Sequence, residues 1–286
     1  ATAWEPNADY SEFTFMLRQD VTFHDGMPFK ADAVKASFDH IVSEAVLESG
    51  GKSLLQDHQY VETLVVDDYT VTVKFAASYP LFLRDAARQW LSISSPAALE
   101  DYGQNYGRNP VGTGPFKFVQ WDAQSQIVLE RNPDYNWGSD FFDHQGPAYL
   151  DEIQFKFFQD TQALNLAAIA GDLDMQERHM IMGNYPVLKE NELAGKYRVI
   201  TWPTFGGSDA IVMFNQTYDK DPMVAELLQS KAFRIAMSYA IDREKIKEAV
   251  FLGLGEALMP VPAPWHPYYP GDESAKKFTE FNQEMA

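Results

Sequence analysis

The histidines are the first residues to test for metal chemistry, because the chain has no cysteine and histidine is the commonest metal ligand in proteins. A metal site on one helix needs ligands a few residues apart. The six histidines are instead scattered: His24, His40, His58, His144, His179 and His266. We therefore expect surface or capping roles for them, with no metal site and no cofactor.

A glycine-rich segment from Gly112 to Gly114 has the composition of a phosphate-binding loop. The Gly-Lys-Ser/Thr ending of such loops is absent, and Pro115 stands where the helix of a nucleotide site should begin. A tight turn that leads into a strand over residues 116–119 fits the sequence better. We expect this turn and no nucleotide site.

Three neighbouring serines, Ser92, Ser94 and Ser95, raise the question of hydrolysis. The Gly-x-Ser-x-Gly sequence that exposes a nucleophilic serine is absent. Paired carboxylates such as Asp172 and Asp174 are common in turns, and glycoside hydrolysis needs two carboxylates that face each other across a cleft. We interpret these residues as solvated, and a hydrolase with an acidic cleft is kept as the alternative of a different class.

Binding of a small solute needs aromatic surface and a few placed polar groups. Trp90, with Ser92 beside it, could line a pocket, and core packing of the indole is an equal alternative. Arg108 could hold a ligand carboxylate through two hydrogen bonds, or could join a surface ion pair. At Phe205 and Gly206 the glycine would let a ligand approach the backbone, and the same residues suit a hinge.

The spacing of apolar residues predicts the elements that position these groups. Alternation predicts strands over residues 13–17, 61–66, 71–75, 116–118, 127–129, 153–157, 197–201 and 211–213. Helical spacing predicts apolar stripes over residues 34–45, 164–170 and 224–228. The expected fold class is therefore mixed α and β, written α/β.

Two consecutive helices are predicted around residue 240. Ser230 can cap the first helix, whose apolar face carries Phe233 and Met237. Asp242 can cap the second helix, which should end near Gly253. Two short helices that meet at one aspartate are typical of a hinge region.

Length and charge restrict the classes of function. A chain of 286 residues exceeds what one hydrophobic core usually organises, so two lobes are expected. A net charge of −18 disfavours nucleic acid and anionic membrane surfaces as partners. No apolar run reaches the roughly 18 residues of a membrane span, and the first residues lack a basic and apolar leader. We expect that any signal or anchor has been removed.

Four segments follow one another in the order and approximate spacing of a known family. They are Phe13–Phe29, Asn109–Phe118, Ile153–Asp174 and Phe233–Arg243. On these segments the chain resembles the family 5 extracellular solute-binding proteins of ABC importers, which include dipeptide, oligopeptide and nickel-binding receptors. One departure is Lys30, which stands where the family usually has a capping Thr or Ser.

The resemblance implies a periplasmic-binding-protein-like fold of type II with two lobes. Members of the family are longer than this chain, so we expect a piece of such a protein. Residues 1–208 would form most of the first lobe, residues 209–286 would begin a truncated second lobe, and the crossing would lie at Gly206. Strands without neighbours would have open edges, which favour non-native self-association.

The resemblance also implies a receptor, not an enzyme, that captures a small solute by hinge closure and presents it to an ABC permease. Peptides are expected first, with oligosaccharides, opines and metal chelates as alternatives. A peptide-binding chaperone or sensor is a further alternative. The implied location is the periplasm or the outer face of the cell membrane, where a lipid anchor would be compatible. The expected ligand contacts are Trp90, Ser92, Arg108, Gly114, Phe205 and Gly206.

Overall fold

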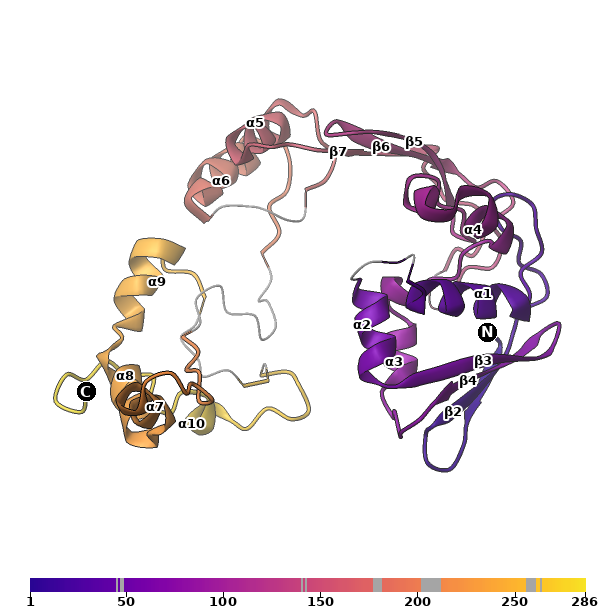
Figure 1. Ribbon diagram of the computed structural model, residues 1–286. Coiled ribbons are helices and arrows are strands. Elements are labelled where there is room, and N and C mark those ends of the chain that lie inside the picture. The colour runs from indigo at the N-terminus through magenta and orange to yellow at the C-terminus, as the bar shows by residue number, and fades with distance from the viewer. Residues whose placement is uncertain are drawn as a thin grey trace. The chain divides into compact units, whose positions relative to one another are not determined.

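The computed structural model describes residues 1–44, 46, 49–139, 141, 143–176, 182–201, 212–255, 261–262 and 264–286. The chain forms two compact units, Ala1–Phe157 and Phe158–Ala286, whose elements are labelled in Figure 1. The predicted lobe boundary at residue 208 lies outside the described residues, as do the expected contacts Phe205 and Gly206. The division into lobes at that position stays a prediction.

The first unit begins with a four-stranded antiparallel sheet in the order β1-β2-β4-β3. Its strands are β1 Ala3–Pro6, β2 Glu12–Met16, β3 Tyr60–Asp67 and β4 Thr70–Phe75. Alternation defines its faces, because Phe13 pairs with Val73 on the buried face and Thr14 pairs with Thr72 on the other. The strands predicted over residues 13–17, 61–66 and 71–75 are confirmed.

Two helices of the first unit, α1 Ala31–Val42 and α2 Gly50–Asp57, pack against this sheet (Figure 1). The residues Val34 and Phe38 of α1 are buried. Lys30 occupies the N-cap position of α1 without a side-chain bond to the helix, since an ammonium cannot accept a hydrogen bond. Its Nζ instead lies 2.8 Å from a carboxylate oxygen of Asp68.

The core of the first unit is a group of aromatic rings around Phe82, the first residue of α3 Phe82–Ala86. Phe82 is 1% exposed, and its ring centroid lies 5.0 Å from that of Phe13 and 4.8 Å from that of Phe75. Such tilted and edge-on pairs add to the stabilisation from burial alone. This core fixes α3, and with it the segment that follows, which carries Trp90.

The rest of the first unit contains a three-stranded antiparallel sheet in the order β5-β6-β7. Its strands are β5 Phe116–Asp122, β6 Gln126–Arg131 and β7 Glu152–Lys156. Along the chain, the segment that connects the two sheets contains the short helices η1 Gln89–Leu91, α4 Pro96–Tyr102 and η2 Gly103–Arg108. The strands predicted over residues 116–118, 127–129 and 153–157 are confirmed.

One edge of the four-stranded sheet is apolar and exposed. The strand β3 is the last in the order and pairs only with β4 among the described strands. Its residues Val61, Val65 and Val66 are exposed. An exposed apolar edge strand is a template for pairing with another chain. The predicted self-association through open edges stays a prediction, and β3 is the edge that fits it.

The described part of the second unit is helical. Its helices are α5 Thr161–Ala170, η3 Met182–Asn184, α6 Tyr185–Leu193, α7 Pro222–Gln229, α8 Lys231–Ala240, α9 Arg243–Phe251 and α10 Asp272–Ala275. The predicted caps are confirmed, because Ser230 Oγ accepts from the Phe233 amide at 3.3 Å and Asp242 accepts from the Lys245 amide at 3.1 Å.

Two strands predicted in the second unit are wrong where they can be compared. Residues 197–201 have no regular structure, and neither do Val212 and Met213, while residue 211 lies outside the description. A strand needs hydrogen-bonding partners on a neighbouring strand. Within the described ranges of this unit no strand is present that could supply them.

Candidate ligand-binding site

Trp90 lies in η1 with its indole ring packed on the start of α2. Trp90 is 44% exposed, so it is not a core residue, although its ring is packed on one side. A Cβ atom on Gly50 would lie 2.8 Å from the ring, and one on Gly51 would lie 2.5 Å from the Trp90 carbonyl oxygen. The two glycines therefore permit this close packing. Part of the indole surface stays open to solvent.

A buried carboxylate supports the side chain that lies over this indole. The Arg88 guanidinium is 5.3 Å from the Trp90 ring centroid, and its Nε is 3.3 Å from an oxygen of Asp85. Asp85 is 2% exposed; it accepts a hydrogen bond from the Tyr79 hydroxyl at 2.7 Å and pairs with Arg84. The Asp85–Arg88 pair thus helps to orient the tryptophan.

The charge of Asp85 is favoured by these partners. Burial alone would raise the pKa of the Asp85 carboxyl. Hydrogen bonds from Arg84 and Tyr79, together with the charges of Arg84 and Arg88, outweigh burial and hold the pKa below its ordinary value. Asp85 is therefore ionised at neutral pH, as its role as a partner of two arginines requires.

Two of the three neighbouring serines, Ser92 and Ser95, are placed as structural residues. Ser92 Oγ donates to the Gln89 carbonyl at 2.8 Å at the end of η1. Ser95 is fully buried, accepts from the Ala98 amide as the N-cap of α4, and donates to a carboxylate oxygen of Asp25 at 2.5 Å. These bonds fix helix ends, and they give no support to a serine nucleophile.

Arg108 takes up an arrangement that differs from both alternatives considered for it. Its guanidinium carbon lies 3.6 Å from the centroid of the Trp121 ring on β5. Stacking of this kind is a cation–π interaction, and it is favourable at the surface by about 0.5–1 kcal/mol. The contact joins the end of η2 to the three-stranded sheet. The role of Arg108 as a ligand contact stays a prediction.

The turn that contains Gly114 is held by side chains from two other segments, one with His24 and one with Asn132 and Trp137. The Gly114 carbonyl accepts from His24 Nε2 at 3.0 Å and from Asn132 Nδ2 at 3.2 Å. The Thr113 carbonyl accepts from Trp137 Nε1 at 2.9 Å. The expected tight turn is thus present and anchored by these bonds. It is followed by the strand β5 and not by the helix that a phosphate-binding loop requires.

Sequence reasoning did not single out Asn132 or Trp137 as partners of this turn, and it assigned His24 only a general role. Asn132 is 2% exposed, and its backbone N–H donates to the Pro115 carbonyl at 2.9 Å. The available signal was the Asn132-Pro133 pair directly after a strand, which predicts a turn. That signal locates the residue but does not name its partner.

A hollow of about 430 Å³ lies beside the turn within the first unit. It is lined by Ala1, Arg18, Val21, Phe29, Thr113, Trp137, Gly138 and Ser139. Phe29 and Trp137 supply apolar surface and Arg18, which pairs with Asp20 at 2.6 Å, supplies a guanidinium. Aromatic walls with a few polar groups suit the binding of a small solute. This hollow and the turn of Gly114 are our candidate site.

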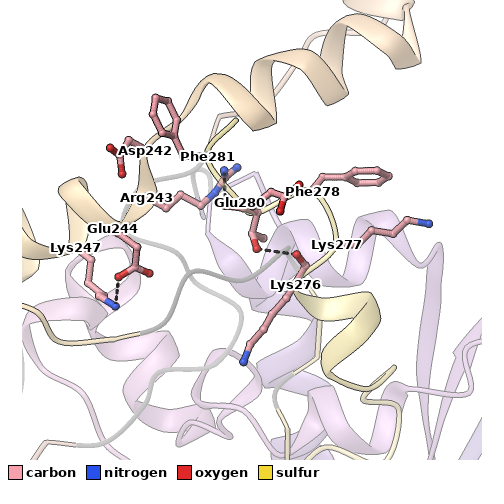
Figure 2. Close-up of a pocket in the computed structure, with 10 residues that line it drawn as sticks. Asp242, Arg243, Glu244, Lys247, Lys276, Lys277, Phe278, Glu280 and Phe281 are labelled. Atoms are coloured by element: carbon pink, nitrogen blue, oxygen red, sulfur yellow. Dashed lines mark hydrogen bonds and ion pairs between the residues drawn. The ribbon is translucent and has the colours of Figure 1, made fainter. Parts of the chain in front are cut away.

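A second hollow, of about 680 Å³, lies within the second unit (Figure 2). Its lining combines Asp242, Arg243, Glu244 and Lys247 with residues 276–281. Arg243 donates to the carbonyls of Ser238 at 2.7 Å and Thr279 at 3.3 Å, and Figure 2 shows Lys247 joined to Glu244. Burial lowers the pKa of Arg243. Its guanidinium fastens the segment around Thr279 to the end of α8.

The structure brings the expected contacts together only in part. Trp90 lies in η1 and Ser92 is the C-cap of that helix, Arg108 lies against β5, and Gly114 lies in its own turn. One direct link joins the region of Trp90 to that turn, because the Ser95 amide donates to the Val111 carbonyl at 3.0 Å. Of the described residues, no group of three or more His, Asp or Glu is placed to hold a metal ion.

Comparison with known proteins identifies the family. The family described as bacterial extracellular solute-binding proteins, family 5 Middle, matches residues 1–286. The probable D,D-dipeptide-binding periplasmic protein DdpA of Escherichia coli (strain K12) is 25% identical over 270 residues, which cover 92% of this chain and 47% of DdpA. The glutathione-binding protein GsiB of Pectobacterium atrosepticum is 32% identical over 254 residues, which cover 88% of this chain and 45% of GsiB.

The fold is shared with solved structures. The oligopeptide-binding protein AppA of Bacillus subtilis, in complex with a nonapeptide, superposes with a TM-score of 0.70 at 24% identity and covers 99% of this chain and 52% of AppA. The expected mixed α and β fold of a periplasmic binding protein is confirmed. The chain spans about half the length of the curated relatives it matches. It belongs to family 5 of the bacterial extracellular solute-binding proteins.

Proposed function

We propose that this chain is part of the solute-binding receptor of an ABC importer and that the receptor binds a peptide without altering it. The match of the family to residues 1–286 carries the proposal. The names of DdpA and GsiB refer to a dipeptide and to glutathione, and the structure of AppA contains a nonapeptide. Peptides are therefore the first solute class to test.

The candidate site has the groups that a peptide needs. Phe29 and Trp137 offer apolar surface for a side chain, and the hydroxyls of Thr113 and Ser139 offer hydrogen bonds. Arg18 would bind a carboxylate in competition with Asp20, its present partner. These groups come from several segments of the first unit, so the solute would contact a preformed surface.

Capture requires a second surface and a movement. Hinge closure traps a ligand when contacts from both lobes stabilise the closed state more than the open one. The proposed lobes are residues 1–208 and 209–286, with the crossing at Gly206. The proposed partner is an ABC permease, and the proposed location is the periplasm or the outer face of the cell membrane. No described helix is long and apolar enough to cross a bilayer.

Oligosaccharides, opines and metal chelates are the alternatives within the family, and they require a different set of polar contacts. A hydrolase is the alternative of another class. Its serine candidates Ser92 and Ser95 are bonded to a carbonyl and to a carboxylate at helix ends. This observation favours binding over catalysis.

The test is incubation of the purified protein with defined pools of peptides, sugars, opines and nickel chelates. We expect one or more peptides to raise the melting temperature, since a ligand that binds only the native state stabilises it. Chromatography of the same mixtures should recover the peptides intact. Stabilisation by sugars or chelates alone would contradict the peptide assignment, and release of cleaved products would contradict the receptor.

A further inference from the structure

His24 lies between two backbone groups of the turn at Gly114. Its Nε2 is 3.0 Å from the Gly114 carbonyl oxygen, and its Nδ1 is 3.4 Å from the Gly112 amide nitrogen. A carbonyl oxygen can only accept a hydrogen bond, whereas an amide N–H can only donate one. The ring must therefore carry its proton on Nε2 and leave Nδ1 as an acceptor.

The backbone of His24 is bound to the same turn. Its amide donates to the Gly112 carbonyl at 2.9 Å, so His24 and Gly112 exchange two hydrogen bonds. Asn132 and Trp137 hold the carbonyls of Gly114 and Thr113. The partner of the Gly112 amide is the ring of His24, whose Cε1 would meet a Cβ on Gly112 at 4.0 Å.

A protonated imidazolium does not suit this arrangement, because both ring nitrogens would then be donors and Nδ1–H would face the Gly112 N–H. Burial lowers the pKa of His24, and the charge of Lys117 lowers it further. The bond to the Gly114 carbonyl and the charge of Asp25 raise this pKa, but the net change is downward. Asp25 itself accepts hydrogen bonds from Ser95 and from the Met27 amide.

We propose that neutral His24, protonated on Nε2, is the positioning residue of this turn and that its protonation on Nδ1 releases the turn and weakens solute binding. The part that concerns binding rests on the proposed function. The turn contributes Thr113 to the wall of the hollow, so a displaced turn changes the surface that the solute meets.

The direction of the pH dependence follows from the neutral state. A histidine whose pKa is lowered by folding stabilises the folded protein fully above its ordinary value of 6.5. This contribution is lost as the pH falls through the lowered pKa of the native state. Solute affinity should decrease over the same pH range. The apolar core of the first unit does not titrate, so its packing should not change over this range.

The test combines nuclear magnetic resonance with hydrogen exchange on the whole chain. At about pH 7.5, where histidine is neutral, we expect the Nδ1 of His24 to give the nitrogen shift of an unprotonated ring nitrogen and Nε2 that of a protonated one. His24→Phe keeps a ring but removes both ring bonds. It should speed exchange of the Gly112 amide at least about tenfold, while the Val73 amide in β4 is unchanged, and raise the peptide Kd about tenfold or more.

The matched control is His144→Phe. His144 is exposed and its ring stacks on Tyr149 outside the turn, so a phenyl ring preserves that contact. This variant should leave both the Gly112 exchange rate and the peptide Kd unchanged. If His24→Phe does not fold, His24→Gln serves instead, because its amide can still donate to the Gly114 carbonyl.

Each outcome decides the proposal. A proton on Nδ1 of His24 at neutral pH, or unchanged exchange of Gly112 in His24→Phe, would overturn the positioning role. Faster exchange with an unchanged peptide Kd would overturn the link to binding. If the unaltered protein bound no solute from any pool, the proposed function would fail, and the ring and exchange measurements would still decide the role of His24.

Discussion

The two compact units use the same local signals for their helices but differ in what the helices bury. In the first unit Ser95 caps α4 and lies fully buried beside Asp25. In the second unit Ser230 caps α8, yet none of the described residues of α7, α8 and α9 is buried. Caps and spacing therefore determine where a helix begins, whereas burial depends on elements that pack against it.

The largest effect should come from the aromatic core of the first unit. Phe82→Ala removes a ring that is 1% exposed and leaves a cavity, and the expected loss is about 3–5 kcal/mol of unfolding free energy. Leu227→Ala is the matched change in the second unit, where the side chain is 45% exposed and the loss should be within about 1 kcal/mol. Urea unfolding of both variants measures the difference, and equal losses would contradict the comparison.

The next effect concerns the contact between α2 and Trp90. Gly51→Ala would place a Cβ 2.5 Å from the Trp90 carbonyl oxygen, so the segment must shift, and we expect a loss of about 1–3 kcal/mol. Tryptophan fluorescence should change as well, since the indole moves. Gly107→Ala has open space around the new methyl group and is the control. An unchanged unfolding midpoint for Gly51→Ala would show that Trp90 is not fixed by the glycines.

A smaller difference should separate the two serine caps. Ser95→Ala removes the cap of a buried serine and also its part-buried hydrogen bond to Asp25, so we expect a loss of about 2 kcal/mol. Ser230→Ala removes a part-exposed cap, and the expected loss is about 0.5–1 kcal/mol. Thermal unfolding of the pair checks the order. A greater loss for Ser230→Ala would mean that the second unit depends on its caps more than the first.

The last prediction concerns the charge of Asp85, whose contribution to stability is fully present at neutral pH and is lost only in acid. A carboxyl whose pKa is lowered by folding stabilises the protein above its ordinary value of 3.8, and this contribution is lost as the pH falls through the native pKa. Denaturant midpoints of the first unit should therefore drop below about pH 4. Asp85→Asn should flatten that drop, and an equal acid dependence in the variant would exclude Asp85 as its source.

Sequence patterns predicted the local structure better than the site. Apart from β1, which was not predicted, the strands of both sheets and the caps at Ser230 and Asp242 follow from alternation and from side chains that accept amide hydrogen bonds. The strand predicted over residues 197–201 was wrong, because alternation does not supply the partner strand. Local pattern thus determines an element only where tertiary structure completes it.

The site could be predicted only as single residues. Gly114, Ser92 and Trp90 were chosen for their types, and the partners of Gly114 and Trp90 come from distant positions. Gly50 and Gly51 make room for Trp90. His24 bonds to the carbonyl of Gly114, which lies 90 residues further along the chain. Periodicity carries no signal for such pairs, since it describes neighbours along one element.

The most direct test is hydrogen–deuterium exchange of the protein with and without a stabilising peptide, with mass analysis of the peptide afterwards. We predict slower exchange at the turn of Gly112 to Gly114 and at Trp137 in the presence of the peptide, which is recovered intact. Binding without any change at this turn, or recovery of a cleaved peptide, would contradict a receptor that holds its solute on this surface.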